Sequence, residues 1–312
     1  MLLLALVAVA TFAFFRFTGG GAPRDADVVV ARGSSLKTAA QALEKAGAIK
    51  SADAFLTNAR LFGSDDAIKP GEYRVTKGMS AGDVLALLQS GRVIQRFVAV
   101  PEGMASVMVH DRLMATPLLT GAVAIPAEGS VLPDNHSYTR GETRAAVVGR
   151  MQKAMQTAIA NAWKKRRPTT MAKSPAEAII LASIVEKETA RADERRAVAA
   201  VYTNRLRIGM PLQADPTTIS PITKGRPIGR RILRSELDAE NGYNTYRRQG
   251  LPVGPITNPG KASIEAVLNP GTGSALYFVA QPDGRSAFAD TLAQHNANVQ
   301  KLYAHRRAKG EM

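Results

Sequence analysis

Two glutamates that lie two residues apart, Glu186 and Glu188, stand in the stretch SPAEAIILASIVEKETARADERR at residues 174–196. On a helix with about 100° between successive residues, Glu188 falls within an apolar stripe, whereas Glu186 falls roughly opposite, beside Ser183. A carboxyl group among aliphatic side chains loses hydration in its charged form, so its pKa rises. Such a group can act as a general acid near neutral pH, which makes Glu188 the candidate catalytic residue. The stripe consists of Ala178, Ile180, Leu181, Ile184 and Val185.

The start of the element that carries these glutamates is well marked in the sequence. Ser174, Pro175 and Glu177 form a capping-box pattern with proline in the first helical position, and we predict a helix over residues 175–191. A purely structural interpretation of Glu188 also stays open, since Arg191 or Arg195 on the next turns could pair with it. A second helix is predicted from about 194 to 208, ending at Gly209.

Composition narrows the function classes. The 312 residues contain 45% hydrophobic side chains and no cysteine, which excludes disulfides, thiolate metal sites and cysteine nucleophiles. The four histidines lack ligand spacing, so we expect no metal and no cofactor. The net charge of +15 favours an anionic partner. Nucleic acid is disfavoured as that partner, because aromatic residues make up only 5% and no zinc-finger, basic-zipper or base-stacking pattern is present.

The first 17 residues, MLLLALVAVATFAFFRF, are almost continuously apolar. At 1.5 Å per residue a helix of this length spans roughly 25 Å, so we predict a short transmembrane anchor at 1–17. The alternative is a cleaved signal peptide, with TGGGAP as its cleavage region; the lack of basic residues before the apolar run favours the anchor. A flexible linker is predicted at 18–27.

A strand, helix, helix, strand order follows, and its last strand lies in KPGEYRV at 69–75. This order and motif resemble a LysM-like module, a small fold that in its family grips N-acetylated glycans. The module is expected to occupy residues 28–96, and a larger catalytic domain residues 97–312. The fold class predicted for the whole chain is therefore α+β.

Five motifs, spaced in order along the chain, resemble the endolytic murein transglycosylases (MltG/YceG-like). They are LASIVEKET at 181–189, YTNRLRIGMPLQADPT at 202–217, YNTY at 243–246, GLPVGPITNPG at 250–260 and LYFVA at 276–280. The resemblance implies a lyase that cuts nascent peptidoglycan strands internally and leaves a 1,6-anhydromuramyl end. It also implies a single-pass protein of the cytoplasmic (inner) membrane, with its catalytic domain on the outer, periplasmic side and peptidoglycan synthases as partners.

The second glutamate of the EKET motif is the catalytic one in this family, and that position is Glu188 here. Gln213, Asn244 and Tyr246 are candidates for binding sugar hydroxyls and acetamides, because amide and phenol groups both donate and accept hydrogen bonds. Glu128 matches a family EG...PD segment and is expected to line the groove. The chain departs from the family pattern at Ser130 and Val131, where bulky residues are common, and in ADPTTISPITKG at 214–225.

Two other functions remain compatible with the sequence. One is a hydrolytic muramidase that uses Glu188 and Glu128 as a carboxyl pair, which would produce reducing ends. The other is a noncatalytic glycan-binding scaffold of the wall-synthesis machinery, which would not need Glu188.

Overall fold

The computed structural model describes residues 7, 10–12, 14, 17 and 21–310. Most of the predicted anchor at 1–17 and part of the linker lie outside these residues. Within the described part of the chain, no helix is both long enough and apolar enough to span a bilayer. The chain divides into two compact units, the first formed by residues up to Phe97 together with Ser137–Glu142, and the second by the remainder.

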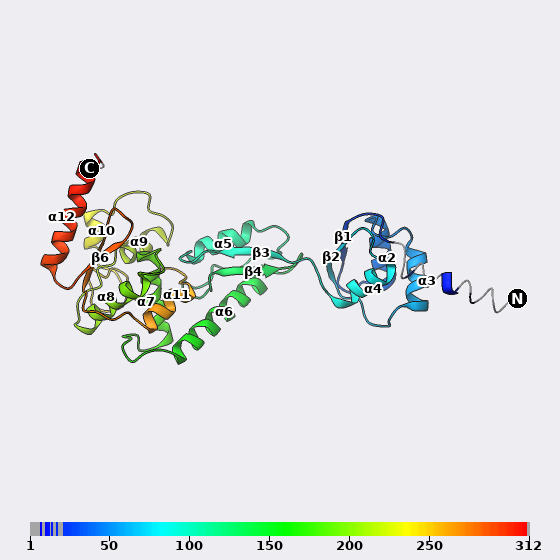
Figure 1. Ribbon diagram of the computed structural model, residues 1–312, viewed down its shortest axis with the longest axis horizontal. Helices are drawn as coiled ribbons and strands as arrows, with labels where there is room; N and C mark the ends of the chain where they lie inside the picture. Colours follow the sequence, from blue (N-terminus) through cyan, green and yellow to red (C-terminus); the bar gives the residue numbers. More distant parts are fainter. Residues whose placement is uncertain (1–6, 8–9, 13, 15–16, 18–20, 311–312) are drawn as a thin grey trace. The chain divides into compact units, whose positions relative to one another are not determined.

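The first unit is built around a two-stranded antiparallel sheet in which Val28 pairs with Tyr73. Its elements are β1 (Ala26–Val30), α2 (Leu36–Lys45), α3 (Ala52–Phe62), β2 (Gly71–Val75) and α4 (Ala81–Ser90). The strand, helix, helix, strand order predicted from the sequence is confirmed for β1 to β2 (Figure 1). Alternate strand residues, among them Val28, Val30 and Val75, are buried beneath the helices, as expected for a sheet with one covered face.

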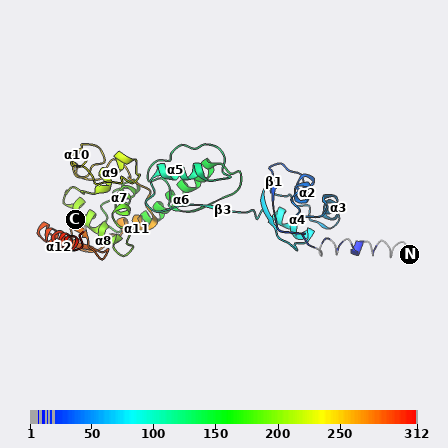
Figure 2. The same ribbon diagram turned by 90° about the horizontal axis from the view of Figure 1, so that it is seen from above.

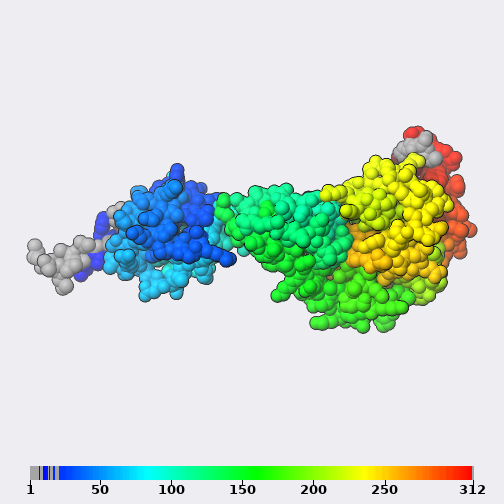
Figure 3. All heavy atoms as spheres, turned by 180° about the vertical axis from the view of Figure 1, so that it is seen from behind, coloured from blue at the N-terminus to red at the C-terminus, as the bar shows by residue number. Residues whose placement is uncertain are grey.

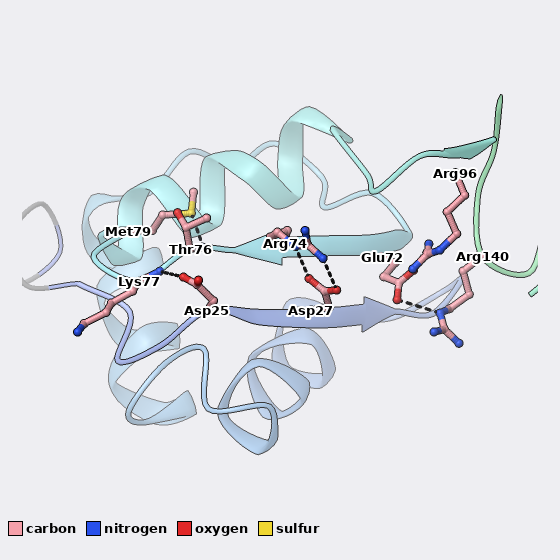
Figure 4. A network of polar contacts seen from close by, with 9 residues as sticks. All are labelled: Asp25, Asp27, Glu72, Arg74, Thr76, Lys77, Met79, Arg96 and Arg140. Atoms are coloured by element: carbon pink, nitrogen blue, oxygen red, sulfur yellow. Dashed lines mark hydrogen bonds and ion pairs between the residues drawn. The ribbon is translucent and has the colours of Figure 1, made fainter. Parts of the chain in front are cut away.

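Ion pairs link β1 with β2 and link β2 with the segments that carry Arg96 and Arg140 (Figure 4). Glu72, whose side chain is only 4% exposed, accepts a 2.6 Å hydrogen bond from Arg96 and lies 3.1 Å from Arg140. Arg74 forms a two-point contact with Asp27 across the sheet. The sequence predicted a division of the chain at residue 96/97. The structure adds Ser137–Glu142 to the first unit, where Arg140 pairs with Glu72.

The second unit is predominantly helical and carries two small sheets, β3–β4 and β5–β6 (Figures 1 and 2). Its elements are β3 (Arg96–Val100), α5 (Ser106–Ala115), β4 (Asp134–Tyr138), α6 (Arg144–Lys164), α7 (Pro175–Glu188), α8 (Arg195–Arg207), α9 (Asp215–Thr223), α10 (Arg234–Asp238), α11 (Lys261–Leu268), β5 (Tyr277–Ala280), β6 (Ser286–Ala289) and α12 (Leu292–Ala308). The first residues of β3 and the last residues of β4 are part of the first unit. The mixed helices and sheets agree with the α+β class predicted for the chain.

Helix α7 forms the centre of the second unit, where it packs against α6, α8, α9 and α11. Leu181, Ile184 and Val185 are fully buried in the main apolar cluster. The segment between α9 and α11 lies at the surface of this unit, where Figure 3 shows it in yellow to orange. An apolar helix with neighbours on several sides is a rigid base for side chains at its end.

The beginning of α7 follows the predicted pattern, but its end does not. Ser174 caps the helix by accepting a hydrogen bond from the Glu177 backbone N–H, whereas the Glu177 carboxylate reaches one residue further back, to the Lys173 backbone N–H. The helix stops at Glu188 instead of continuing to 191, because Thr189 adopts an extended conformation with φ of −142°. Glu188 is therefore the last helical residue, at the edge of the core.

Candidate active site

Glu188 lies at the carboxyl end of α7, among groups contributed by α8 and α9. Burial of its carboxyl group raises its pKa to about 7. A hydrogen bond with the Tyr202 side chain opposes this rise, the negative charge of Asp215 adds to it, and the positive charge of Arg205 opposes it. The dominant cause is thus loss of hydration, as expected for a carboxyl group at the edge of an apolar core. Such a group can both hold and release a proton near neutral pH.

The ion pair considered as an alternative for Glu188 is not formed among the described residues. Arg191 pairs instead with Asp193, at 2.7 Å, and with Glu194. Arg195 lies 3.7 Å from Glu186 and also pairs with Glu102. Both arginines have other partners because the chain turns after Glu188, so the next residues do not continue along the same helix.

Glu186 performs a different task on another side of α7. Its side chain is only 5% exposed, and its Oε2 accepts a 2.8 Å hydrogen bond from the Gly260 backbone N–H. Nearby, the Ser183 hydroxyl accepts a hydrogen bond from the Ile256 backbone N–H at 3.0 Å. The side of α7 that carries these two residues therefore holds the 256–260 segment in place.

Helix α8 supplies Tyr202 and Arg205 to the surroundings of Glu188. Tyr202 is buried, and its ring meets Phe278 of β5 edge-on with 6.1 Å between ring centroids. The Arg205 guanidinium donates to the carbonyl oxygens of Leu276 and Leu212 at 2.6 and 2.7 Å. Burial lowers the pKa of Arg205. Packing and hydrogen bonds thus hold a phenol and a cation in fixed positions beside the carboxyl group.

Two of the predicted sugar ligands, Gln213 and Tyr246, belong to this same region. Gln213 is exposed, and its side-chain oxygen lies 3.4 Å from the Arg205 guanidinium. The half-buried Tyr246 donates its hydroxyl proton to Asp215 Oδ1 at 2.5 Å. Burial, followed by this hydrogen bond, raises the pKa of Tyr246. Gln213 and Tyr246 therefore contact Arg205 and Asp215, the same two charged residues that act on Glu188.

Asn244 has a supporting position beneath the surface. It is fully buried, and its amide nitrogen donates to the carbonyl oxygens of Leu237 and Ala239 at 2.9 and 2.7 Å. Its amide oxygen accepts from the Tyr246 backbone N–H at 3.0 Å. In this structure Asn244 offers no surface to a sugar, and it shapes the segment that carries Tyr246.

Glu128 lies in a different polar cluster from Glu188. Its carboxylate accepts hydrogen bonds from the Ser106 backbone N–H and hydroxyl, and from the Asn258 amide. Burial raises the pKa of Glu128, while the bonds from Ser106 oppose the rise. Because the residue before Ser106 provides no side-chain cap, Glu128 satisfies the first turn of α5 from a distant segment. The hydrogen-bond partners of Glu128 thus come from α5 and the 256–260 segment, whereas the groups that act on Glu188 come from α8 and α9.

Three neighbours of Glu188 were not identified as functional from the sequence: Tyr202, Arg205 and Asp215. Asp215 precedes a proline, begins α9 and contacts Tyr246. Arg205 lies in the last turn of α8. The one available signal was their occurrence within the family-like motif at 202–217, since contacts between separate segments have no local pattern. Among the described residues, no cluster of histidine, aspartate or glutamate suits a metal ion.

Comparison with known proteins points in one direction. A family model described as the YceG-like family matches residues 28–301. The endolytic murein transglycosylase of Bacillus subtilis (strain 168) is 25% identical over 315 residues, covering 91% of this chain and 86% of that protein. That of Streptococcus pneumoniae serotype 2 (strain D39) is also 25% identical, with 87% of this chain and 57% of the longer protein covered. A crystal structure of a yceG-like protein from Listeria monocytogenes is similar over 88% of this chain and 99% of its own, with a TM-score of 0.54 and 26% identity.

Proposed function

This chain belongs to the YceG-like family, and from that membership we propose that it is an endolytic lytic transglycosylase of peptidoglycan. The bond cut is the β-1,4 linkage between N-acetylmuramic acid and N-acetylglucosamine within nascent strands, and the cut terminates strand elongation. The observation that carries the proposal is the Glu188 carboxyl group, whose pKa is raised to about 7 in a motif shared with this family. The similar proteins named endolytic murein transglycosylases support it at the family level.

The first proposed step uses the protonated form of Glu188. Its proton moves to the glycosidic oxygen, the bond between that oxygen and C1 of the muramyl residue breaks, and the N-acetylglucosamine part leaves with the proton. Positive charge develops at C1 as the bond breaks. A pKa of about 7 keeps a useful fraction of the acid protonated at neutral pH, which an ordinary glutamate does not.

The second proposed step uses the carboxylate that the first step leaves. The muramyl 6-hydroxyl oxygen forms a bond to C1, and its proton returns to Glu188, so water is not consumed. The hydrogen bond from Tyr202 and the charge of Arg205 stabilise the carboxylate between the steps, since both lower the pKa of Glu188. One carboxyl group can therefore perform both proton transfers.

A hydrolytic muramidase would need a second carboxyl group in the same site. Glu128 is the residue that the sequence suggests for this role, but it accepts its hydrogen bonds from Ser106 and Asn258. The carboxyl group that acts on Glu188 is Asp215, which accepts the hydrogen bond of the Tyr246 hydroxyl. Because protein donors already engage both of these carboxylates, the arrangement favours the single-acid mechanism. A noncatalytic scaffold is the third possibility, and it would give no cleavage products.

We also propose that the first unit is a LysM-like module that holds the glycan strand, and that a membrane anchor places the protein on the outer side of the cytoplasmic membrane near peptidoglycan synthases. The antiparallel β1–β2 pair with two intervening helices is compatible with such a module. Its affinity for N-acetylated chains can be measured with soluble glycan fragments.

The test is mass spectrometry of peptidoglycan strands digested by the purified protein in ¹⁸O-labelled water. We expect 1,6-anhydro ends without label, and no cleavage by Glu188→Gln, which keeps the size of the side chain but cannot supply the proton. Glu186→Gln is the matched control on the same helix and is expected to retain most of the cleavage. Reducing ends that carry the label would instead establish a muramidase, and equal loss in both folded variants would overturn the single-acid assignment.

A further inference from the structure

A second acidic side chain, Asp215, lies on the Glu188 side of the site and contacts Tyr246. The two residues are 31 positions apart in the chain, and the Tyr246 hydroxyl lies 2.5 Å from Asp215 Oδ1. Both groups are electrostatic neighbours of Glu188, which faces Tyr202 and Arg205 from α8, Asp215 from α9 and Tyr246 from the segment after α10. The contact therefore belongs to the surroundings of the candidate acid and is not an isolated surface pair.

Buried hydrogen bonds hold the two segments together beneath this contact. The Gln213 backbone N–H donates to the Thr245 carbonyl oxygen at 3.1 Å, and the Ala214 backbone N–H donates to the Thr245 hydroxyl at 3.0 Å. The hydroxyls of Thr217 and Thr245 lie 2.8 Å apart. Because Thr217 and Thr245 are fully buried, these hydrogen bonds join the start of α9 firmly to the turn that carries Tyr246.

The backbone beside Asp215 adopts a conformation that ordinary residues avoid. Gln213 has a φ of +50°, in the left-handed region that favours glycine. Such a conformation costs of order 1 kcal/mol or more and persists where the surroundings impose it, often at functional sites. Here it turns the chain so that α9 begins with Asp215 next to Tyr246.

We propose that Asp215 is a positioning residue of this site, because its carboxylate accepts the only hydrogen bond that the Tyr246 hydroxyl can donate and places a negative charge beside Glu188. A phenol has one hydrogen to donate. Once this hydrogen is committed to Asp215, the Tyr246 oxygen can only accept a hydrogen bond. Tyr246 is then selective for donors of the bound glycan, namely a sugar hydroxyl or the N–H of an acetamido group. This inference rests on the proposed glycan cleavage.

The charge of Asp215 has a separate, measurable effect. It raises the pKa of Glu188, whereas the hydrogen bond from Tyr202 lowers it. Asp215→Asn should therefore move the titration of Glu188 to lower pH, and Tyr202→Phe should move it to higher pH. Tyr246→Phe leaves the carboxylate of Asp215 in place, so it should not move the titration to lower pH. If Asp215 had only a structural role, Asp215→Asn and Tyr202→Phe would not shift the titration of Glu188 in opposite directions.

The first measurement is ¹³C NMR titration of the glutamate carboxyl groups in the full chain, with the Glu188 signal assigned by its absence from Glu188→Gln. The expected result is a shift to lower pH in Asp215→Asn and to higher pH in Tyr202→Phe. Asp111→Asn, which neutralises an exposed carboxylate paired with Arg226, is the matched control and should leave the signal in place. An unchanged Glu188 titration in folded Asp215→Asn would overturn the charge effect, whether or not the protein cleaves glycan.

The second measurement is the kinetics of strand cleavage. Tyr246→Phe removes the acceptor oxygen and should lower kcat/KM by about 3- to 10-fold, the worth of one hydrogen bond. We expect the cleavage rate to fall at high pH as Glu188 loses its proton, and Tyr246→Phe should not move this fall to lower pH. A glycan that lacks the acetamido N–H or sugar hydroxyl contacted by Tyr246 should lower kcat/KM of the wild type by the same factor. The same modified glycan should lower kcat/KM of Tyr246→Phe very little, because the hydrogen bond is already absent. Equal losses in both proteins for every modified glycan would overturn the acceptor role. Absence of anhydro products from the wild type would refute the proposed function, while the NMR titration would still decide the charge effect.

Discussion

At pH 8 the Glu188 carboxyl group is mostly ionised in a place where burial makes a charge costly. Its pKa is 4.5 in an ordinary setting and about 7 in the folded protein, so the folded state holds this proton to higher pH than the unfolded chain does. Stability from this group is therefore fully present below about pH 4.5 and is lost as the pH rises through 7. The same burial that lets Glu188 hold a proton near neutral pH therefore lowers the stability of the fold at pH 8.

From this linkage we predict that Glu188→Gln is more stable than the wild type at pH 8. A neutral amide of the same size avoids the buried charge, and the free energy of unfolding should rise by about 1–3 kcal/mol. The difference should shrink towards pH 4.5, where both side chains are neutral. Urea denaturation at several pH values measures it, and a difference that stays constant with pH would contradict the raised pKa. Glu186→Gln is the control and should not be stabilised, because it loses its charge opposite Arg195.

At the scale of elements, Asn258 joins three segments of the second unit. Its amide oxygen accepts from the Val131 backbone N–H at 3.0 Å, and its amide nitrogen donates to the Met104 carbonyl oxygen at 2.9 Å and to Glu128. The Asn258 carbonyl oxygen also accepts from the Gly103 backbone N–H. This buried amide therefore fastens the start of α5 and the 128–131 segment to the loop that Glu186 holds against α7.

We predict that Asn258→Ala lowers the free energy of unfolding by about 2–4 kcal/mol, because it leaves the buried Val131 backbone N–H and the half-buried Met104 carbonyl oxygen without this partner. Urea denaturation monitored by the fluorescence of the single tryptophan measures this loss. The exposed Asn161→Ala is the matched control, with an expected change within about 0.5 kcal/mol. If both variants changed the free energy of unfolding by a similar amount, the hydrogen bonds of the Asn258 amide would not stabilise the contact between these segments.

At the scale of the whole molecule, the two units differ in their secondary structure and in the function proposed for each. The first has a sheet covered by helices, and the second carries the candidate acid at the end of its central helix. The predicted anchor at 1–17 precedes both, and its attachment to a bilayer would keep the catalytic unit near nascent strands. The net charge of +15 would add attraction to anionic lipid headgroups or an acidic polymer.

We predict that the full-length protein fractionates with membranes, whereas a chain that begins near Arg24 does so only weakly and in a salt-dependent way. The physical reason is that an apolar helix inserts irrespective of ionic strength, while surface charge is screened by salt. Membrane flotation at low and high salt checks this. Identical behaviour of the two chains would contradict the anchor, and a mature N-terminus around Ala22 or Pro23 would indicate a cleaved signal peptide.

Local order was largely determined by the sequence alone. The Ser174 cap of α7 lies where the residue pattern placed the start of this helix, because capping depends on residues within one turn. The position of Glu188 relative to an apolar stripe also followed from helical periodicity. The family-like motifs identified the region of the site for the same reason, since each motif is a short continuous segment.

Only the tertiary structure decided which distant groups meet Glu188. Tyr202, Arg205 and Asp215 reach it through the packing of α8 and α9 against α7 and through a left-handed residue at Gln213. The roles of Asn244 and Glu128 were likewise decided by burial and by partners in other segments. Hydrogen bonds and Coulomb interactions depend on separation in space, whereas sequence spacing constrains that separation only within a few residues. The type of acid was therefore readable from the chain, but the neighbours that set its proton affinity were not.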